Sequence, residues 1–275
     1  MSAANKAKPV GVIDPGGVLG QIMAAKANRL AEAKQRVAES DLIGALRDKR
    51  ERNSLLSAVS RPDCVNVIAE IKQRSPSRGI IRHDFDPLAI GASYARSGAA
   101  AISVLAEEDY FGGSLDHVRI VRQVVDLPLL RKDFIFDGYQ VYESAAASAN
   151  ALLLIVAMLE DGLLAELIAM SAELGLDALV EVHDADEMER ASRARARIIG
   201  VNNRDLKSLD VNLATSLSLA KMAAPDAVLV AESGITSGDD IRRLRSAGFK
   251  AFLIGEHLMR ASDPGEALRQ LIGTV

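Results

Sequence analysis

Two oppositely charged residues directly follow an apolar segment in the first third of the chain. Residues 65–69 (VNVIA) have the β-branched character of a buried strand, and Glu70 and Lys72 come next. Because they are two positions apart, they are expected on the same side of a strand. A carboxylate and an ammonium at the mouth of an apolar strand cost desolvation free energy unless they serve each other or a ligand. The pair is therefore a candidate for chemistry.

The same arrangement recurs further along the chain. The polar residues that end later apolar runs are Lys132, Glu181, Asn202, Glu232 and Ser233. Parallel strands that each deliver a polar group at the C-terminal end are typical of an active site.

Lys72, Lys132 and Glu181 are the candidates for acid–base chemistry. Burial between apolar strands lowers the pKa of a lysine, and a nearby carboxylate raises it again. This competition can bring an amine into the range of a general acid, with Glu181 as the partner base. The alternative for each residue is a buried ion pair that stabilises the end of the sheet. Convergence of two lysines and two glutamates favours catalysis.

Gly234 and Gly255 follow the last two apolar runs and predict a phosphate site. In barrels of parallel strands an anion commonly lies beyond strands seven and eight, on backbone N–H groups. A glycine lets the backbone approach the anion, and Ser75, in the turn after the first strand, adds a hydroxyl. Each glycine taken alone is more simply a turn residue. Glu256 follows Gly255, and its carboxylate is expected to turn away.

Aromatic residues make up only 4% of the chain, so Phe111 and Phe134 stand out. Phe134 shares a face with Lys132, and an apolar wall beside cations suits a substrate with an aromatic ring and an acidic group. Core packing is the alternative for both residues. Arg204, two positions after Asn202, can clamp a carboxylate.

Apolar runs of strand length alternate with segments of helical period throughout the chain. The expected strands are residues 65–72, 100–107, 127–133, 151–156, 177–182, 197–203, 227–233 and 251–256. Helix signals lie between them: Asp86 before Pro87 as an N-cap, and cap-to-glycine segments over residues 161–175 and 237–248. Eight such units predict an α/β fold, a (β/α)8 TIM barrel. The alternative is an open doubly wound sheet, which the missing Gly-x-Gly-x-x-Gly turn disfavours.

Residues 1–275 are expected to form a single barrel domain, with residues 18–50 as an N-terminal helical extension. Helices are predicted over residues 20–38 and 42–50, and the first carries a thin apolar stripe of Ile22, Leu30 and Val37. This extension either packs over the barrel or closes over the substrate.

The composition narrows the functional class. The net charge of -4 gives no basic footprint for nucleic acid, and no apolar run reaches the length of a membrane span. The single cysteine, Cys64, excludes an internal disulfide and fits a reducing compartment. The first 17 residues lack the apolar core of a signal peptide, so a cytoplasmic location is expected. His83, His117, His183 and His257 show no metal-ligand spacing, so no metal is expected.

Several of these motifs together resemble the indole-3-glycerol phosphate synthase family of tryptophan biosynthesis. They are residues 68–72 (IAEIK), 75–77 (SPS), 103–105 (SVL), 111–114 (FGGS), 130–134 (LRKDF), 179–183 (LVEVH), 200–206 (GVNNRDL) and 232–235 (ESGI). The resemblance runs in order from the N-terminal helices to residues 258–260. It implies a (β/α)8 barrel without a cofactor, acting on a phosphorylated small molecule, 1-(2-carboxyphenylamino)-1-deoxyribulose 5-phosphate. Candidate protein partners are other enzymes of the tryptophan pathway.

The resemblance also implies catalytic roles. Lys132 would be the general acid on the ribulose carbonyl. Lys72 would pair with the anthranilate carboxylate and act as an acid in the dehydration. Glu181 would be a base or would stabilise the cationic intermediate, while Glu70 and Asn202 would hold sugar hydroxyls and the lysines.

The remaining positions would bind the substrate. By resemblance Ser75, Gly234 and Gly255 would bind the phosphate. Phe111 and Phe134 would flank the ring. The positions that complete the pocket are Arg204, Glu232 and Ser233.

Two other functions are compatible with the residues alone. One is an aldolase that forms a Schiff base between Lys132 and a phosphosugar. The other is a phosphosugar-binding regulator that kept the fold without the chemistry, which the intact acid and base positions disfavour.

Overall fold

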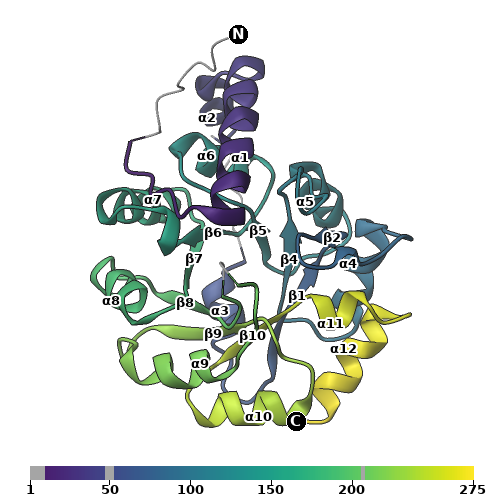
Figure 1. Ribbon diagram of the computed structural model, residues 1–275. Coiled ribbons are helices and arrows are strands. Elements are labelled where there is room, and N and C mark those ends of the chain that lie inside the picture. The colour runs from purple at the N-terminus through teal and green to yellow at the C-terminus, as the bar shows by residue number, and fades with distance from the viewer. Residues whose placement is uncertain (1–9, 47–52, 206–207) are drawn as a thin grey trace.

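Eight parallel strands close into a barrel, as the alternation of apolar and helical segments predicts (Figure 1). The computed structural model describes residues 10–46, 53–205 and 208–275. The barrel strands are β1 (Asn66–Ile71), β4 (Ala101–Leu105), β5 (Leu129–Lys132), β6 (Ala151–Ile155), β7 (Asp177–Val182), β8 (Ile198–Asn202), β9 (Val228–Glu232) and β10 (Ala251–Ile254). Pairing of β1 with both β4 and β10 closes the circle and excludes the open sheet.

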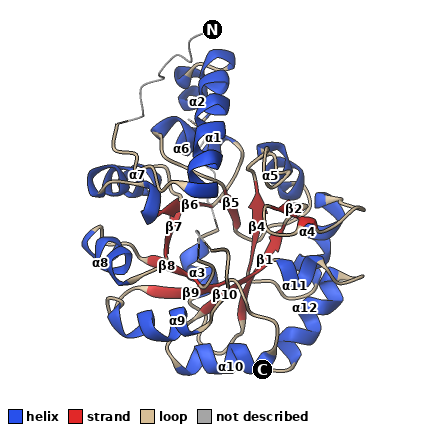
Figure 2. Ribbon diagram, viewed as in Figure 1, coloured by secondary structure: helices blue, strands red, loops and turns tan. Residues whose placement is uncertain are grey.

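Helices surround the strands on the outside of the barrel (Figure 2). They are α4 (Pro87–Arg96), α5 (Leu115–Arg122), α6 (Gly138–Ala146), α7 (Asp161–Glu173), α8 (Ala185–Arg193), α9 (Ala214–Leu219), α10 (Gly238–Ser246), α11 (Glu256–Met259) and α12 (Pro264–Gly273), with 3-10 turns η1 (Val156–Met158) and η2 (Ala220–Met222). The caps predicted at Asp86 and Ser237 are confirmed, whereas α7 begins after Glu160 without a side-chain cap hydrogen bond. Asp86 accepts hydrogen bonds from the N–H groups of Leu88 and Ala89, and Ser237 forms a capping box with Asp240.

Both faces of most barrel strands are buried, which explains their nearly continuous apolar sequences. The charged side chains Lys132, Glu181, Glu232 and Glu70 lie at or next to the C-terminal ends of their strands. Lys132, Asn202 and Glu232 are the last residues of β5, β8 and β9. In this fold the C-terminal ends of the strands are the face that carries catalytic groups.

In the described residues ahead of β1 the helices are α1 (Gly17–Arg36), α2 (Glu39–Ala45) and α3 (Leu55–Val59). Ile22 and Leu30 of the expected α1 stripe are buried, but Val37 is 41% exposed because it lies beyond the end of the helix. The second predicted helix, over residues 42–50, begins earlier, at Glu39, and residues 47–50 lie outside the described residues.

A short hairpin that the sequence patterns did not predict follows β1. Its strands are β2 (Arg74–Ser75) and β3 (Gly79–Ile80), and it holds Ser75 in a buried position beside the end of β1. Among the helices of the described ranges, none has both the length and the apolar character that a membrane span requires.

Candidate active site

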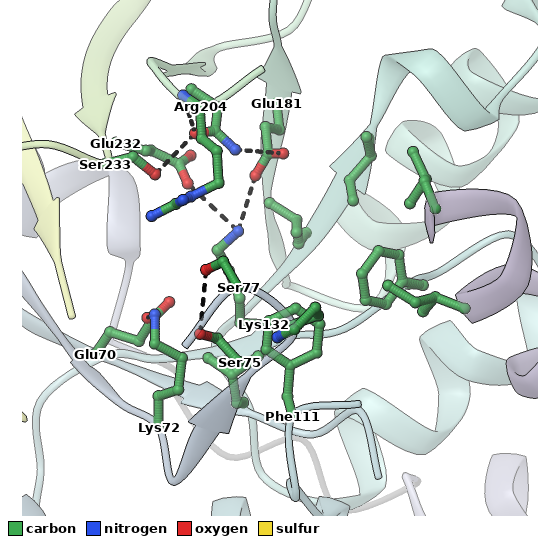
Figure 3. Close-up of a pocket in the computed structure, with 18 of the residues that line it drawn as sticks. Glu70, Lys72, Ser75, Ser77, Phe111, Lys132, Glu181, Arg204, Glu232 and Ser233 are labelled. Atoms are coloured by element: carbon green, nitrogen blue, oxygen red, sulfur yellow. Dashed lines mark hydrogen bonds and ion pairs between the residues drawn. The ribbon is translucent and has the colours of Figure 1, made fainter. Parts of the chain in front are cut away.

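Lys132 lies between two carboxylates at the C-terminal mouth of the barrel. Its Nζ is 2.8 Å from Oε2 of Glu181 on β7 and 3.4 Å from Oε2 of Glu232 on β9 (Figure 3). Both glutamate side chains are only 2% exposed. Glu70 of β1 completes the set, so one ammonium faces three carboxylates. The four residues come from alternate strands, which is how a single layer of a barrel interior is filled.

The charges of this layer decide the protonation of Lys132 and Glu181. Burial acts to lower the pKa of Lys132, but Glu181, Glu232 and Glu70 outweigh it and raise this pKa above its ordinary value. Charge pairing with the carboxylates therefore has a larger effect than desolvation, and Lys132 is a protonated ammonium and not an amine with a lowered pKa. Burial acts to raise the pKa of Glu181, yet Lys132 and His183 together lower it.

The pKa of Glu232 is raised, unlike that of Glu181, because Lys132 lies farther from it, at 3.4 Å, and compensates its burial less. Burial and the negative charges of Glu181 and Glu70 raise its pKa to about 8, against the opposing effect of Lys132. Its Oε1 is buried and has no hydrogen-bond partner among the described residues. A neutral carboxylic acid at this place can donate a hydrogen bond to a ligand.

Glu70 and Lys72 form the second acid–base pair, on β1 and just after it. Lys72 Nζ lies 2.5 Å from Glu70 Oε1, so the two side chains do share a side, as their spacing predicts. Gly255 sits directly behind this pair, and a Cβ at this position would overlap the Glu70 carboxylate. Glycine is therefore required here by the close approach of β1.

Asn202 links the catalytic layer to the phosphate side of the mouth. Its Nδ2 donates to Glu181 Oε1 at 3.1 Å, and its Oδ1 accepts from Ser233 Oγ at 2.9 Å. These bonds join Asn202 to a hydroxyl and to the carboxylate that pairs with Lys132, and a role in holding the lysines stays a prediction. Ser233 adopts a positive φ of 65°, a strained conformation that directs its side chain to Asn202.

The expected phosphate residues surround a cavity next to the catalytic layer. Gly234 and Gly255 line it together with Lys72, Arg204 and Ser233. Gly234 has φ 79°, a conformation that favours glycine.

Ser75, the third expected phosphate residue, is not among the described residues that line this cavity. It lines the catalytic cavity, and its Oγ is 3.4 Å from the hydroxyl of Ser77 (Figure 3). Ser77 also lines that cavity, a role that no pattern in the sequence indicated.

Glu256 does not turn away from the mouth as expected. It lines both cavities, with its carboxylate 3.1 Å from Arg78, 3.5 Å from Arg204 and 3.6 Å from Arg260. The pairing with arginines explains why a carboxylate is tolerated at this rim. Arg204 also donates to the carbonyl oxygen of Leu209, so it is held at the edge of the site.

Phe111 and Phe134 form the expected apolar wall. Their ring centroids are 6.1 Å apart, and both rings line the catalytic cavity. Glu107, whose role the sequence did not indicate, shapes the loop that carries Phe111. Its buried carboxylate accepts hydrogen bonds from the N–H groups of Asp109, Tyr110 and Phe111.

Helix α1 forms part of the same wall. Val18, Leu19 and Ile22 line the catalytic cavity, which favours the interpretation of the extension as a cover over the substrate. The helix is held by Lys26, whose Nζ lies 2.8 Å from Asp133, the residue after Lys132. Lys26 is only 4% exposed, but it gave no sequence signal because α1 is rich in lysine and arginine throughout.

Together these features define a (β/α)8-barrel enzyme that places acids and bases beside a pocket for an anion. Solved structures at low identity share the fold. They include 3-hexulose-6-phosphate synthase from Salmonella typhimurium (TM-score 0.61, 14% identity, 76% of this chain and 98% of that chain) and thiamine phosphate pyrophosphorylase from Pyrococcus furiosus (TM-score 0.58, 16% identity, 75% and 93%).

Sequence relatives give the specific assignment. The family model described as indole-3-glycerol phosphate synthase matches residues 19–271. An indole-3-glycerol phosphate synthase of Desulfosudis oleivorans is 46% identical over 94% of this chain and 99% of its own length. A protein of the same name from Acidovorax sp. is 47% identical over 87% of this chain and 88% of its own length. The chain belongs to the indole-3-glycerol phosphate synthase family, whose members are carboxy-lyases of tryptophan biosynthesis.

Proposed function

We propose that this chain closes the indole ring of 1-(2-carboxyphenylamino)-1-deoxyribulose 5-phosphate and releases carbon dioxide and water. The observation that supports this most is the layer in which Lys132 faces Glu181, Glu232 and Glu70. An ammonium that three carboxylates keep protonated is placed to hydrogen-bond a carbonyl oxygen and to transfer its proton as that oxygen gains negative charge in the attack. It lies between an aromatic wall and a pocket for an anion, the two ends of such a substrate.

Binding places the reacting carbons against each other. The phosphate would contact Ser75 and the backbone at Gly234 and Gly255, and the aromatic ring would lie beside Phe111 and Phe134. When the phosphate and the aromatic ring are both held, the ring carbon and the carbonyl carbon are kept close together, which favours ring closure.

Ring closure would begin when Lys132 donates a proton to the ribulose carbonyl oxygen. The ring carbon that bears the carboxylate attacks the carbonyl carbon, and positive charge develops on the ring. The fixed negative charge of Glu181 stabilises that cation. Carbon dioxide then leaves, and its bonding electrons return to the ring and restore aromaticity.

Dehydration would complete the indole. Lys72 donates a proton to the new hydroxyl, which leaves as water, while Glu181 takes a proton from the neighbouring carbon. Glu70 holds Lys72 in place through their ion pair. The groups that would contact the sugar hydroxyls and the substrate carboxylate are Asn202, Arg204, Glu232 and Ser233.

The direct test is to mix the enzyme with the carboxyphenylamino substrate and follow indole fluorescence. Borohydride in the presence of substrate examines the aldolase alternative, since a stable adduct on Lys132 would establish a Schiff base. The raised pKa of Lys132 argues against that chemistry, because a protonated amine is not a nucleophile. Tight substrate binding without an indole signal would instead support the regulator.

We also propose a single barrel domain over residues 1–275, with residues 18–50 as its N-terminal extension, and a cytoplasmic location. The single cysteine supports that location, because it fits a reducing compartment. Enzymes of the tryptophan pathway are the proposed protein partners, because one of them must supply the phosphorylated substrate. Neither nucleic acid nor a membrane is a proposed partner.

A further inference from the structure

We infer that His183 is a positioning residue for the ring-closing reaction, because its imidazole lies within ion-pair distance of the Glu181 carboxylate, at the oxygen that Lys132 does not contact. His183 follows Glu181 by two positions, directly after the end of β7, so the two side chains are expected on the same side of the chain. Its Nε2 lies 3.2 Å from Glu181 Oε1, while Lys132 Nζ lies 2.8 Å from Glu181 Oε2. Oε1 of Glu181 therefore faces His183 together with the amide of Asn202, while Oε2 faces Lys132.

A second carboxylate fixes the orientation of the imidazole. Nδ1 of His183 lies 3.0 Å from Oε2 of Glu187 on α8, and the backbone N–H of His183 donates to the same oxygen at 2.8 Å. Glu187 is itself held at the first turn of α8, where its N–H donates to Asp184. The imidazole ring is thus bracketed by carboxylates at both nitrogens.

Two flanking carboxylates make the doubly protonated imidazolium the favoured form. The charged groups that face the ring are Glu181 on β7 and Glu187 on α8, and both raise the pKa of His183, to about 10, against the effect of burial. Around Glu181 the neighbouring strands add Lys132, Asn202 and Glu232. His183 is the only cation besides Lys132 within ion-pair distance of Glu181 among the described residues.

The His183 imidazolium becomes important when Lys132 loses its positive charge during the reaction. Once Lys132 has given its proton to the carbonyl oxygen, Glu181 loses its main counter-charge in a buried site, and burial would raise its pKa. Glu181 would then take up a proton before the ring cation needs stabilisation. An imidazolium that takes no part in the proton transfer keeps Glu181 ionised through that step.

The inference rests on the roles proposed for Lys132 and Glu181, and it is tested by His183→Gln with two readouts. In the first, kcat is measured against pH. Loss of the His183 imidazolium should shift the acid limb of the profile to higher pH by about one unit. KM should change less than kcat. His117→Gln is the matched control, since His117 is also half-buried but packs against Phe85, away from the site.

The second readout does not depend on activity. The chain has four histidines, so a difference between the nuclear magnetic resonance spectra of the parent and His183→Gln proteins assigns the ring signals of His183. Their titration should be displaced upward from the ordinary value near 6.5. Ordinary titration of these signals, or an acid limb that matches the parent, would overturn the inference. Absence of indole formation by the parent protein would instead reject the proposed function.

Glu187→Gln serves if His183→Gln does not fold. It leaves the imidazole in place, and Glu187 lies outside the described residues that line the catalytic cavity. Removing this anion should lower the pKa of His183, so the alkaline limb of kcat should move toward neutral pH. A profile identical to that of the parent would then count against the inference.

Discussion

The ammonium of Lys132 and the carboxylate of Glu181 lie 2.8 Å apart although their strands, β5 and β7, are separated by β6. The contact therefore crosses the barrel interior and does not follow the sheet. Side chains at the ends of alternate strands meet in this way in a barrel interior.

Replacing Lys132 by Ala should reduce kcat by about 10³-fold, because the proposed general acid is lost. Binding of a substrate analogue in which the carbonyl is reduced to an alcohol should change little. Steady-state kinetics and calorimetry measure the two quantities. Lys221→Ala, an exposed lysine on η2, is the control, and equal loss of folding and turnover in Lys132→Ala would mark the residue as structural.

Glu181→Gln keeps the shape of the side chain and removes its charge. We expect kcat to fall by about 10²-fold, with a smaller change in substrate affinity, because the ring cation loses its counter-charge and the dehydration loses its base. An unchanged rate in a fluorescence assay would remove Glu181 from the mechanism.

Glu232→Gln should alter how stability depends on pH. The pKa of Glu232 is raised to about 8 in the folded protein, so its contribution to stability is full below its unfolded pKa and is lost as the pH rises toward 8. The free energy of unfolding should therefore fall less between pH 5 and pH 8 in the variant than in the parent. Urea titrations at several pH values measure this, and parallel curves would show that Glu232 is already ionised.

Lys26→Met should loosen α1 from the barrel. Lys26 is buried against Asp133, and removing one partner of a buried pair costs about 3 kcal/mol. Lys34→Met is the matched control on the same helix, because Lys34 pairs with Asp137 but is 42% exposed and should cost less than about 1 kcal/mol. Thermal unfolding compares the two variants, and equal losses would contradict a special role for Lys26.

Gly255→Ala should disable the site while leaving the fold intact. The added methyl group would overlap the Glu70 carboxylate and displace the ion pair with Lys72. Gly162→Ala is the control, because a Cβ at that helical position meets nothing within 4 Å. Full activity of Gly255→Ala would show that Glu70 can move without consequence.

Sequence patterns predict the barrel well because apolar strand runs and helix caps both depend only on residues that are close together in the sequence. Most barrel strands are apolar runs with charged or polar residues near their ends, and helices such as α4 and α10 carry caps that can be read from short motifs. The helix over residues 42–50 was predicted less well, since its start at Glu39 follows an Ala without a side-chain cap.

The layout of the site is only partly contained in such patterns. Spacing on one strand pairs Glu70 with Lys72, but the contacts of His183 and Glu256 depend on neighbours that the closed barrel brings together. The pKa of Lys132 was unpredictable for the same reason. Its direction depends on how many carboxylates lie within reach, which the order of residues along the chain does not state.

Closure of the circle by β1 and β10 has a consequence for the order in which the protein matures. During synthesis the edge of β1 that will pair with β10 stays open until residues 251–254 have been made. Gly255, which packs behind Glu70, comes directly after that last strand. The reacting groups, all made earlier, are therefore gathered into one closed mouth only after β10 has been made and has paired with β1.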